Sequence, residues 1–295
     1  MKKIAILGCE NSHADAFLKC IKEKEEFSAI EVVGVYSDEL DTAEKLREQF
    51  GVPILADYAD AVGKVDGIMI TARHGDNHFK YAKPYIESGI PMYIDKPITN
   101  GEEEALTFMA QLRANGIRIS GGSSLKKDEF VMRLKAERES DEGGKTLGGY
   151  VRAPYEKDSE YGGLFFYAQH LVEMEGEIFG RYPISVWAKP NGDQIHVLFH
   201  YEEYDCVGLF CNEKYKYFAS RMSEKTSDAY MIPTSSAKDW FYREFREFCD
   251  LLDGKPQEMS YEDFIAPVFV MSAIARSLES GKEELVNSFE IGGEK

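Results

Sequence analysis

The sequence predicts an α/β protein in which a doubly wound parallel sheet is followed by an α+β domain with an open, largely antiparallel sheet. Three observations support this fold class. Short apolar runs alternate with helical segments over the first 120 residues, apolar and polar residues alternate between 185 and 232, and a length of 295 residues accommodates about two domains. We place the first domain at residues 1–122 and the second at residues 123–295.

Strands and helices alternate regularly through the first domain. Each return connection between parallel strands is a right-handed crossover, usually a helix, so this alternation predicts parallel pairing. Asn100, with Glu103 three residues later, is the expected N-cap of the last helix. The expected strands are 4–7, 32–36, 54–55, 67–71, 91–94 and 117–120, and the expected helices begin at about 12, 41, 76 and 101.

The pattern changes after the Gly-Gly-Ser-Ser segment at 121–124. Stretches such as 195–200 and 206–210 alternate with a period of two and are separated by turn residues, which is typical of antiparallel strands. Helices are expected at about 126–139, 236–253 and 261–280.

Composition excludes several classes of partner. The net charge is −17, so phosphate backbones and anionic lipid surfaces would repel the chain. No apolar run approaches the roughly 20 residues that cross a bilayer. The five scattered cysteines contain no CxxC pair, which indicates reduced thiols in a cytoplasmic protein and argues against a metal site.

Ligands of open parallel sheets bind beyond the carboxyl ends of the strands. The first such end is the loop 8–13, where Rossmann-like dinucleotide sites read GxGxxG. Only Gly8 matches, because Glu10 and His13 replace the second and third glycines. A structural turn is therefore the alternative to a nucleotide site here. The cofactor-binding residues expected in this loop are Gly8, Glu10, Asn11, Ser12 and His13.

The second strand end is Ser37-Asp38. A carboxylate at this point can accept hydrogen bonds from an unphosphorylated ribose and would repel a 2′-phosphate. The sequence therefore favours NAD over NADP, which is the alternative cofactor. The other interpretation is that Asp38 caps the helix that follows.

Two further strand ends carry polar residues. One is the segment 71–78, from which Thr71, Ala72, His74 and His78 are expected to contact a cofactor. The other is Asp95-Lys96-Pro97, where the proline restricts the backbone around the lysine. A lysine at the floor of a crevice loses hydration, which favours proton exchange near neutral pH.

Taken together, these strand ends resemble the Gfo/Idh/MocA family of NAD(P)-dependent oxidoreductases. The hallmark of that family is a Glu-Lys-Pro tripeptide, matched here by Asp95-Lys96-Pro97 with one conservative change. A second family motif, G-x-x-x-D-x-G-x-H, aligns with residues 162–170 and places His170 on the usual catalytic acid/base, with Glu173 following. The motif's aspartate is Phe166 here, so the family's Lys, Asp and His trio is reduced to Lys96 and His170.

The resemblance implies a dehydrogenase that transfers a hydride between nicotinamide and a secondary alcohol of a sugar or polyol. Lys96 and His170 are the expected catalytic residues, contributed by different domains and converging on one alcohol. A homodimer or homotetramer is expected, since relatives associate through the second sheet. The residues expected to contact substrate are Lys126, Tyr155, Tyr167, His170 and Glu173.

Two departures leave a rival interpretation open. Glu10 in the glycine loop and Phe166 at the acidic position would also suit a protein that binds a nucleotide or sugar as a sensor, without chemistry. Bound but inert nucleotide would favour that sensor.

Overall fold

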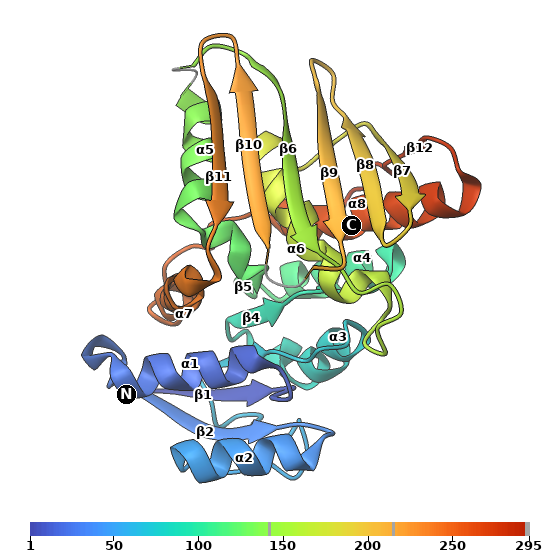
Figure 1. Cartoon of the computed structure of the whole chain (residues 1–295). Coiled ribbons are helices and arrows are strands. Elements are labelled where there is room, and N and C mark those ends of the chain that lie inside the picture. The colour runs from blue at the N-terminus through green and yellow to red at the C-terminus, as the bar shows by residue number, and fades with distance from the viewer. Residues whose placement is uncertain (141–142, 214–215, 293–295) are drawn as a thin grey trace. The chain divides into compact units, whose positions relative to one another are not determined.

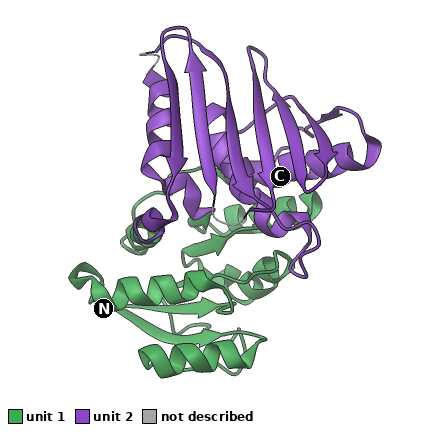
Figure 2. Ribbon diagram, viewed as in Figure 1, with its two compact units in different colours: residues 1–122, 241–262, 291–295 green, residues 123–240, 263–290 purple. Residues whose placement is uncertain are grey.

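The computed structural model describes residues 1–140, 143–213 and 216–292 (Figure 1). The chain packs as two compact units, which Figure 2 colours separately. The first contains Met1–Gly122, Phe241–Glu262 and Ile291–Lys295, and the second contains Ser123–Trp240 and Asp263–Glu290. Two later stretches of the chain thus pack with the first unit, and the division into domains at 122/123 stays a prediction.

Five parallel strands form the sheet of the first unit, in the order β2-β1-β3-β4-β5. Every residue of β3, β4 and β5 is buried, as expected for strands covered by helices on both faces. The predicted doubly wound parallel sheet is confirmed. Its elements are β1 (Lys2–Leu7), α1 (Ser12–Glu23), β2 (Ile30–Tyr36), α2 (Leu40–Phe50), β3 (Gly67–Ile70), α3 (Asp76–Ala82), η2 (Lys83–Ser88), β4 (Met92–Asp95), α4 (Glu102–Ala114) and β5 (Ile119–Gly122).

Three details of the first unit differ from expectation. Residues 54–55 contribute a single bridge, between Ile54 and Val35, in place of a strand. The helix expected to begin at about residue 76 is divided between α3 and the 3-10 helix η2, because Pro84 has no amide hydrogen to continue the α-helical ladder. Asn100 is not the N-cap of α4: Gly101 holds that position, and the Asn100 side chain donates to Asp76 Oδ1 at 3.0 Å.

The second unit has a seven-stranded sheet in the order β11-β10-β6-β9-β8-β7-β12. The sheet is largely antiparallel, as predicted, and the pair β6 and β9 is the parallel exception. Its elements are η3 (Ser124–Lys127), α5 (Glu129–Ser140), β6 (Thr146–Pro154), α6 (Leu164–Phe179), β7 (Ser185–Asn191), β8 (Gln194–His200), β9 (Asp205–Cys211), β10 (Tyr217–Ser223), β11 (Ser227–Ile232) and β12 (Glu284–Leu285), with α7 (Ala237–Leu252) and α8 (Tyr261–Ser280) near the end of the chain.

Helices α5 and α6 pack on one face of this sheet (Figure 1). Strand β8 illustrates the consequence, because Ile195, Val197 and Phe199 are buried toward the helices. The side chains between them point the other way, and Leu198 there is partly exposed. This period of two is the pattern that predicted the strand.

Among the described helices, none is both long and apolar enough to cross a bilayer. Within the described ranges, His, Cys, Asp and Glu side chains form no group of three or more that could hold a metal ion. All five cysteines are present as free thiols.

Candidate cofactor and catalytic site

Gly8 makes the turn that ends β1. Its φ of +80° is a left-handed conformation that favours glycine, and a Cβ atom there would lie 2.4 Å from the Ala72 backbone. Thr71 Oγ1 donates to the Gly8 carbonyl oxygen at 2.9 Å. The structure therefore brings together three of the predicted residues, Gly8, Thr71 and Ala72, at the carboxyl ends of β1 and β3.

Glu10 occupies the position of the second glycine in a dinucleotide loop. Its Oε2 accepts a hydrogen bond from Ser37 Oγ at 2.8 Å, and its Oε1 accepts one from the Arg73 amide at 3.0 Å. These two donors stabilise the carboxylate and hold it at the ends of β2 and β3. Glu10 and Ser37, both predicted cofactor residues, thus contact each other directly.

Asp38 lies just beyond β2 with 54% of its side chain exposed. It accepts hydrogen bonds from Tyr36 Oη at 2.5 Å and Tyr81 Oη at 2.9 Å, and Lys80 Nζ lies 3.6 Å away. The Tyr36 hydrogen bond is the largest of the effects that lower the pKa of Asp38, so the group is ionised at neutral pH. The interpretation of Asp38 as a helix cap is wrong, because Glu39 is the N-cap residue of α2.

The tripeptide 95–97 follows β4 and is deeply buried. Asp95 is completely buried, and its Oδ1 accepts a hydrogen bond from the Lys96 amide at 2.7 Å. Lys96 has 3% of its surface exposed, and the bond to Pro97 is cis. The other carboxylate oxygen, Asp95 Oδ2, lies 2.5 Å from His13 Nδ1 and 3.2 Å from Asn11 Nδ2.

The contacts that His13 makes were not expected from its place in the loop 8–13. Its ring lies against Asp95 and packs edge-on against Phe241, with the ring centroids 4.7 Å apart. Ser12, the first residue of α1, is exposed, and its hydroxyl lies 3.4 Å from Asn11 Oδ1. No side chain caps the N-terminus of α1 in the described structure.

The two remaining histidines of the predicted cofactor set differ in exposure. His78 is fully buried, with Nε2 2.9 Å from the Ala72 carbonyl oxygen and Nδ1 3.3 Å from that of Ile98. Burial lowers the pKa of His78, so the ring is neutral. This ring joins two backbone segments, and its contact with a cofactor stays a prediction. His74 is partly exposed, and its Nδ1 accepts from the Asp76 amide at 3.3 Å.

A cluster of buried polar side chains lies in the second unit, centred on Glu173 of α6. Glu173 Oε2 pairs with Lys126 Nζ at 3.1 Å. Its Oε1 accepts from the Ser123 amide at 2.9 Å and from Gln169 Nε2 at 2.7 Å. His170 Nδ1 lies 2.6 Å from Ser123 Oγ. Three predicted residues, Lys126, His170 and Glu173, therefore belong to one network.

Of the two predicted tyrosines, one joins this cluster. The Tyr167 ring packs edge-on against His170, with centroids 5.0 Å apart. Tyr155 instead donates its hydroxyl to the Asp193 carbonyl oxygen at 3.1 Å. Phe166, at the position of the family's aspartate, packs between aromatic rings, with Tyr161 at 5.2 Å and Tyr167 at 5.8 Å between centroids.

Ser123 and Gln169 were missed by sequence reasoning. Gln169 precedes His170 and lies one helical turn before Glu173, a spacing that could have suggested the contact. Ser123 follows a strand and begins a 3-10 helix, where a serine is ordinarily a cap; its oxygen does accept from the Leu125 amide at 3.3 Å. Its additional contact with His170 is a long-range one that no spacing rule predicts.

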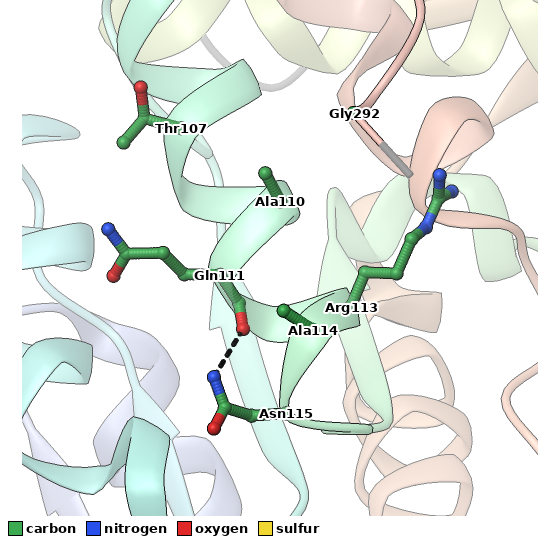
Figure 3. Close-up of a pocket in the computed structure, with 7 residues that line it drawn as sticks. All are labelled: Thr107, Ala110, Gln111, Arg113, Ala114, Asn115 and Gly292. Carbon is green, nitrogen blue, oxygen red and sulfur yellow. Dashed lines mark hydrogen bonds between the residues drawn. The ribbon is translucent and has the colours of Figure 1, made fainter. Parts of the chain in front are cut away.

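A surface hollow of about 580 Å³ lies beside the C-terminal end of α4 (Figure 3). Two of its polar side chains have partners: Arg113 donates to the Ile291 carbonyl oxygen at 3.1 Å, and Asn115 donates to the Gln111 carbonyl oxygen at 2.9 Å. None of the predicted site residues lines it. The lining residues are Thr107, Ala110, Gln111, Arg113, Ala114, Asn115 and Gly292.

Comparison with known proteins supports the resemblance given above. Residues 2–122 match the Gfo/Idh/MocA family, described as an oxidoreductase family with an NAD-binding Rossmann fold. No curated protein matches the chain in sequence.

Solved structures agree over nearly the whole chain. A myo-inositol dehydrogenase from Corynebacterium glutamicum has a TM-score of 0.83 at 16% identity, covering 98% of this chain and 100% of that one. A scyllo-inositol dehydrogenase from Lactobacillus casei has a TM-score of 0.84 at 14% identity, with 98% and 99% covered. An oxidoreductase from Agrobacterium radiobacter, solved with NAD+, L-tartaric acid and magnesium, has a TM-score of 0.81 at 13% identity, with 97% and 98% covered. At these identities the similarity establishes the fold.

Proposed function

We propose, from the match of residues 2–122 to the Gfo/Idh/MocA family of NAD-binding oxidoreductases, that this chain is an NAD-dependent dehydrogenase acting on a secondary alcohol of a sugar, polyol or related small molecule. The observation that carries the proposal is the buried lysine of Asp95-Lys96-Pro97, at the carboxyl end of a central parallel strand. The inositol dehydrogenases among the similar structures support the class of substrate.

The residues of the first unit fit NAD. Gly8 provides a turn in which a side chain would overlap Ala72, and the uncapped N-terminus of α1 offers backbone amides to a phosphate. The exposed, ionised Asp38 can accept hydrogen bonds from ribose hydroxyls. Glu10 is the unfavourable residue for a pyrophosphate, and its bonds to Ser37 and Arg73 offset part of its charge.

Asp38 should determine the choice between the two nicotinamide cofactors. Wild type should bind NADH at least about tenfold more tightly than NADPH, because the 2′-phosphate of NADPH would meet an ionised carboxylate. Asp38→Ala should weaken NADH binding and remove most of the preference, as measured by calorimetric titration. Asp41→Ala, which makes the same charge change at an exposed position of α2, is the control. Equal affinities in wild type would show that Asp38 does not contact the ribose.

The reaction requires a hydride acceptor and a proton acceptor. NAD+, when bound, supplies the hydride acceptor. We assign the hydroxyl proton to His170, whose imidazole takes it as the alcohol is oxidised to a ketone. Lys96 stabilises the negative charge that develops on the same oxygen. Lys126, Glu173 and Tyr167, grouped around His170, are the proposed substrate contacts.

The test of this function is direct. Purified protein mixed with NAD+ and a panel of inositols, sugars and other polyols should form NADH, followed by its absorbance. The alternative function, a nucleotide- or sugar-binding sensor, is favoured by Glu10 and by the apolar Phe166. Binding of NAD+ without reduction by any member of the panel would favour the sensor.

Self-association through the second sheet is part of the same proposal. The face of that sheet opposite to α5 and α6 carries partly exposed apolar side chains on three neighbouring strands, Trp187, Leu198 and Val207, around a shallow apolar hollow. A second copy of the chain would cover them, giving a homodimer or homotetramer that light scattering would detect.

The free cysteines support a reducing compartment, the cytoplasm.

A further inference from the structure

Ser123 and His170 form the shortest contact of the polar cluster in the second unit. Ser123 Oγ lies 2.6 Å from His170 Nδ1. The serine is completely buried, and His170 has 7% of its surface exposed. A hydrogen bond of this length in a buried setting fixes the plane of the imidazole ring.

Hydrogen bonds hold both the backbone and the side chain of Ser123. Its amide donates to Glu173 Oε1 at 2.9 Å, and its hydroxyl oxygen accepts from the Leu125 amide at 3.3 Å. Glu173 is held in turn by Lys126 and Gln169. The buried network thus fixes the backbone of Ser123, and turning the hydroxyl away from His170 would break its contact with the Leu125 amide.

We propose that Ser123 is the positioning residue of His170: its hydroxyl holds Nδ1 and leaves Nε2 as the nitrogen that exchanges a proton with the alcohol. The inference rests on the proposed function and deepens it. Phe166, one turn before His170 on α6, carries no polar atom that could orient the ring. The orienting group comes instead from the segment that follows β5.

A hydroxyl suits this task in both protonation states of the ring. It accepts a hydrogen bond when Nδ1 carries a proton and donates one when Nδ1 does not. An ionised carboxylate can only accept, and would favour the protonated ring. The charged groups of this cluster, Lys126 and Glu173, pair with each other, and the rings of Tyr167 and Tyr217 pack edge-on against His170.

The test compares Ser123→Ala with Ser123→Thr, and uses Ser124→Ala at the neighbouring buried serine as the matched control. The imidazole nitrogen signals of His170, measured by 15N NMR and assigned by their loss in His170→Gln, should shift in Ser123→Ala. Threonine should restore them, and Ser124→Ala should leave them unchanged. The kcat of Ser123→Ala should fall about tenfold, with the KM for NAD+ within about twofold of wild type.

Unchanged His170 signals in Ser123→Ala would overturn the inference, as would a shift that threonine fails to reverse. The NMR measurement needs no substrate, so it separates the two proposals. If wild type oxidises none of the polyols, the proposed function fails while the contact is still measured. If wild type is active and Ser123→Ala keeps its full kcat, the positioning role alone fails.

Discussion

Replacing Lys96 with methionine should reduce kcat by at least about a thousandfold while leaving the protein folded. Methionine keeps most of the length and apolar surface of the lysine stem, so the packing around a residue with 3% exposure is largely retained. The substitution removes the positive charge, which in a buried site stabilises an alkoxide far more than it would in water. The loss should therefore be in turnover, with a small effect on NAD+ affinity.

The measurement is steady-state NADH formation with the best polyol of the panel, alongside the melting temperature. Lys64→Met, at an exposed position, is the control for the loss of one positive charge. Lys96→Arg separates the effect of the charge from that of the side-chain shape, because a guanidinium keeps the positive charge but lacks the compact shape of an ammonium group. This variant should recover little of the rate. Full activity of Lys96→Met would remove Lys96 from the reaction.

The fold of this protein could be predicted because its signals are local. Apolar runs ending in glycine or aspartate marked β1, β2 and β4 at the edge where Gly8, Asp38 and Asp95 lie. The exceptions have identifiable causes. Residues 54–55 are a single pair of apolar residues and form only a bridge, and Pro84 divides the helix that was expected to begin at about residue 76.

The site was less predictable, because its contacts join residues far apart in the sequence. The pairing of His13 with Asp95 crosses from the first loop to the fourth strand, and the contact of Ser123 with His170 joins a 3-10 helix to α6. The resemblance to the family motif identified His170 and Glu173, and Lys126 was a candidate because it follows the Gly-Gly-Ser-Ser segment, but neither signal revealed the network that connects them. Tyr155, chosen for its aromatic ring, uses its hydroxyl on the Asp193 carbonyl and lies outside that network.

Glu175, a second buried carboxyl group of α6, should make the stability of the protein depend strongly on pH. It is almost completely buried, and burial raises its pKa from 4.5 to about 8. Its Oε1 lies 2.7 Å from Tyr201 Oη, which is also 2.6 Å from the Gly180 carbonyl oxygen. The tyrosine has one hydroxyl proton and the carbonyl can only accept, so the pattern is satisfied when a protonated Glu175 donates to Tyr201 and Tyr201 donates to Gly180.

The sign of the pH dependence follows from this arrangement. Below a pH of about 4.5, Glu175 is protonated in both the folded and the unfolded chain, and its contribution to stability is fully present. As the pH rises from there toward about 8, the unfolded chain releases the proton and the folded chain keeps it. The free energy of unfolding therefore falls by up to roughly 1.4 kcal/mol per pH unit over this range, an upper limit that sums to a few kcal/mol.

Glu175→Gln tests this dependence. The amide cannot ionise but still donates to the Tyr201 oxygen, so the variant should match wild type near pH 5 and exceed it by a few kcal/mol at pH 8. Urea unfolding at a series of pH values measures the difference, and other titrating groups cancel in the comparison. Glu202→Gln, at an exposed position, should follow wild type at every pH. Parallel curves for Glu175→Gln and wild type would mean that Glu175 is already ionised in the folded protein, with Tyr201 donating to it instead of to Gly180.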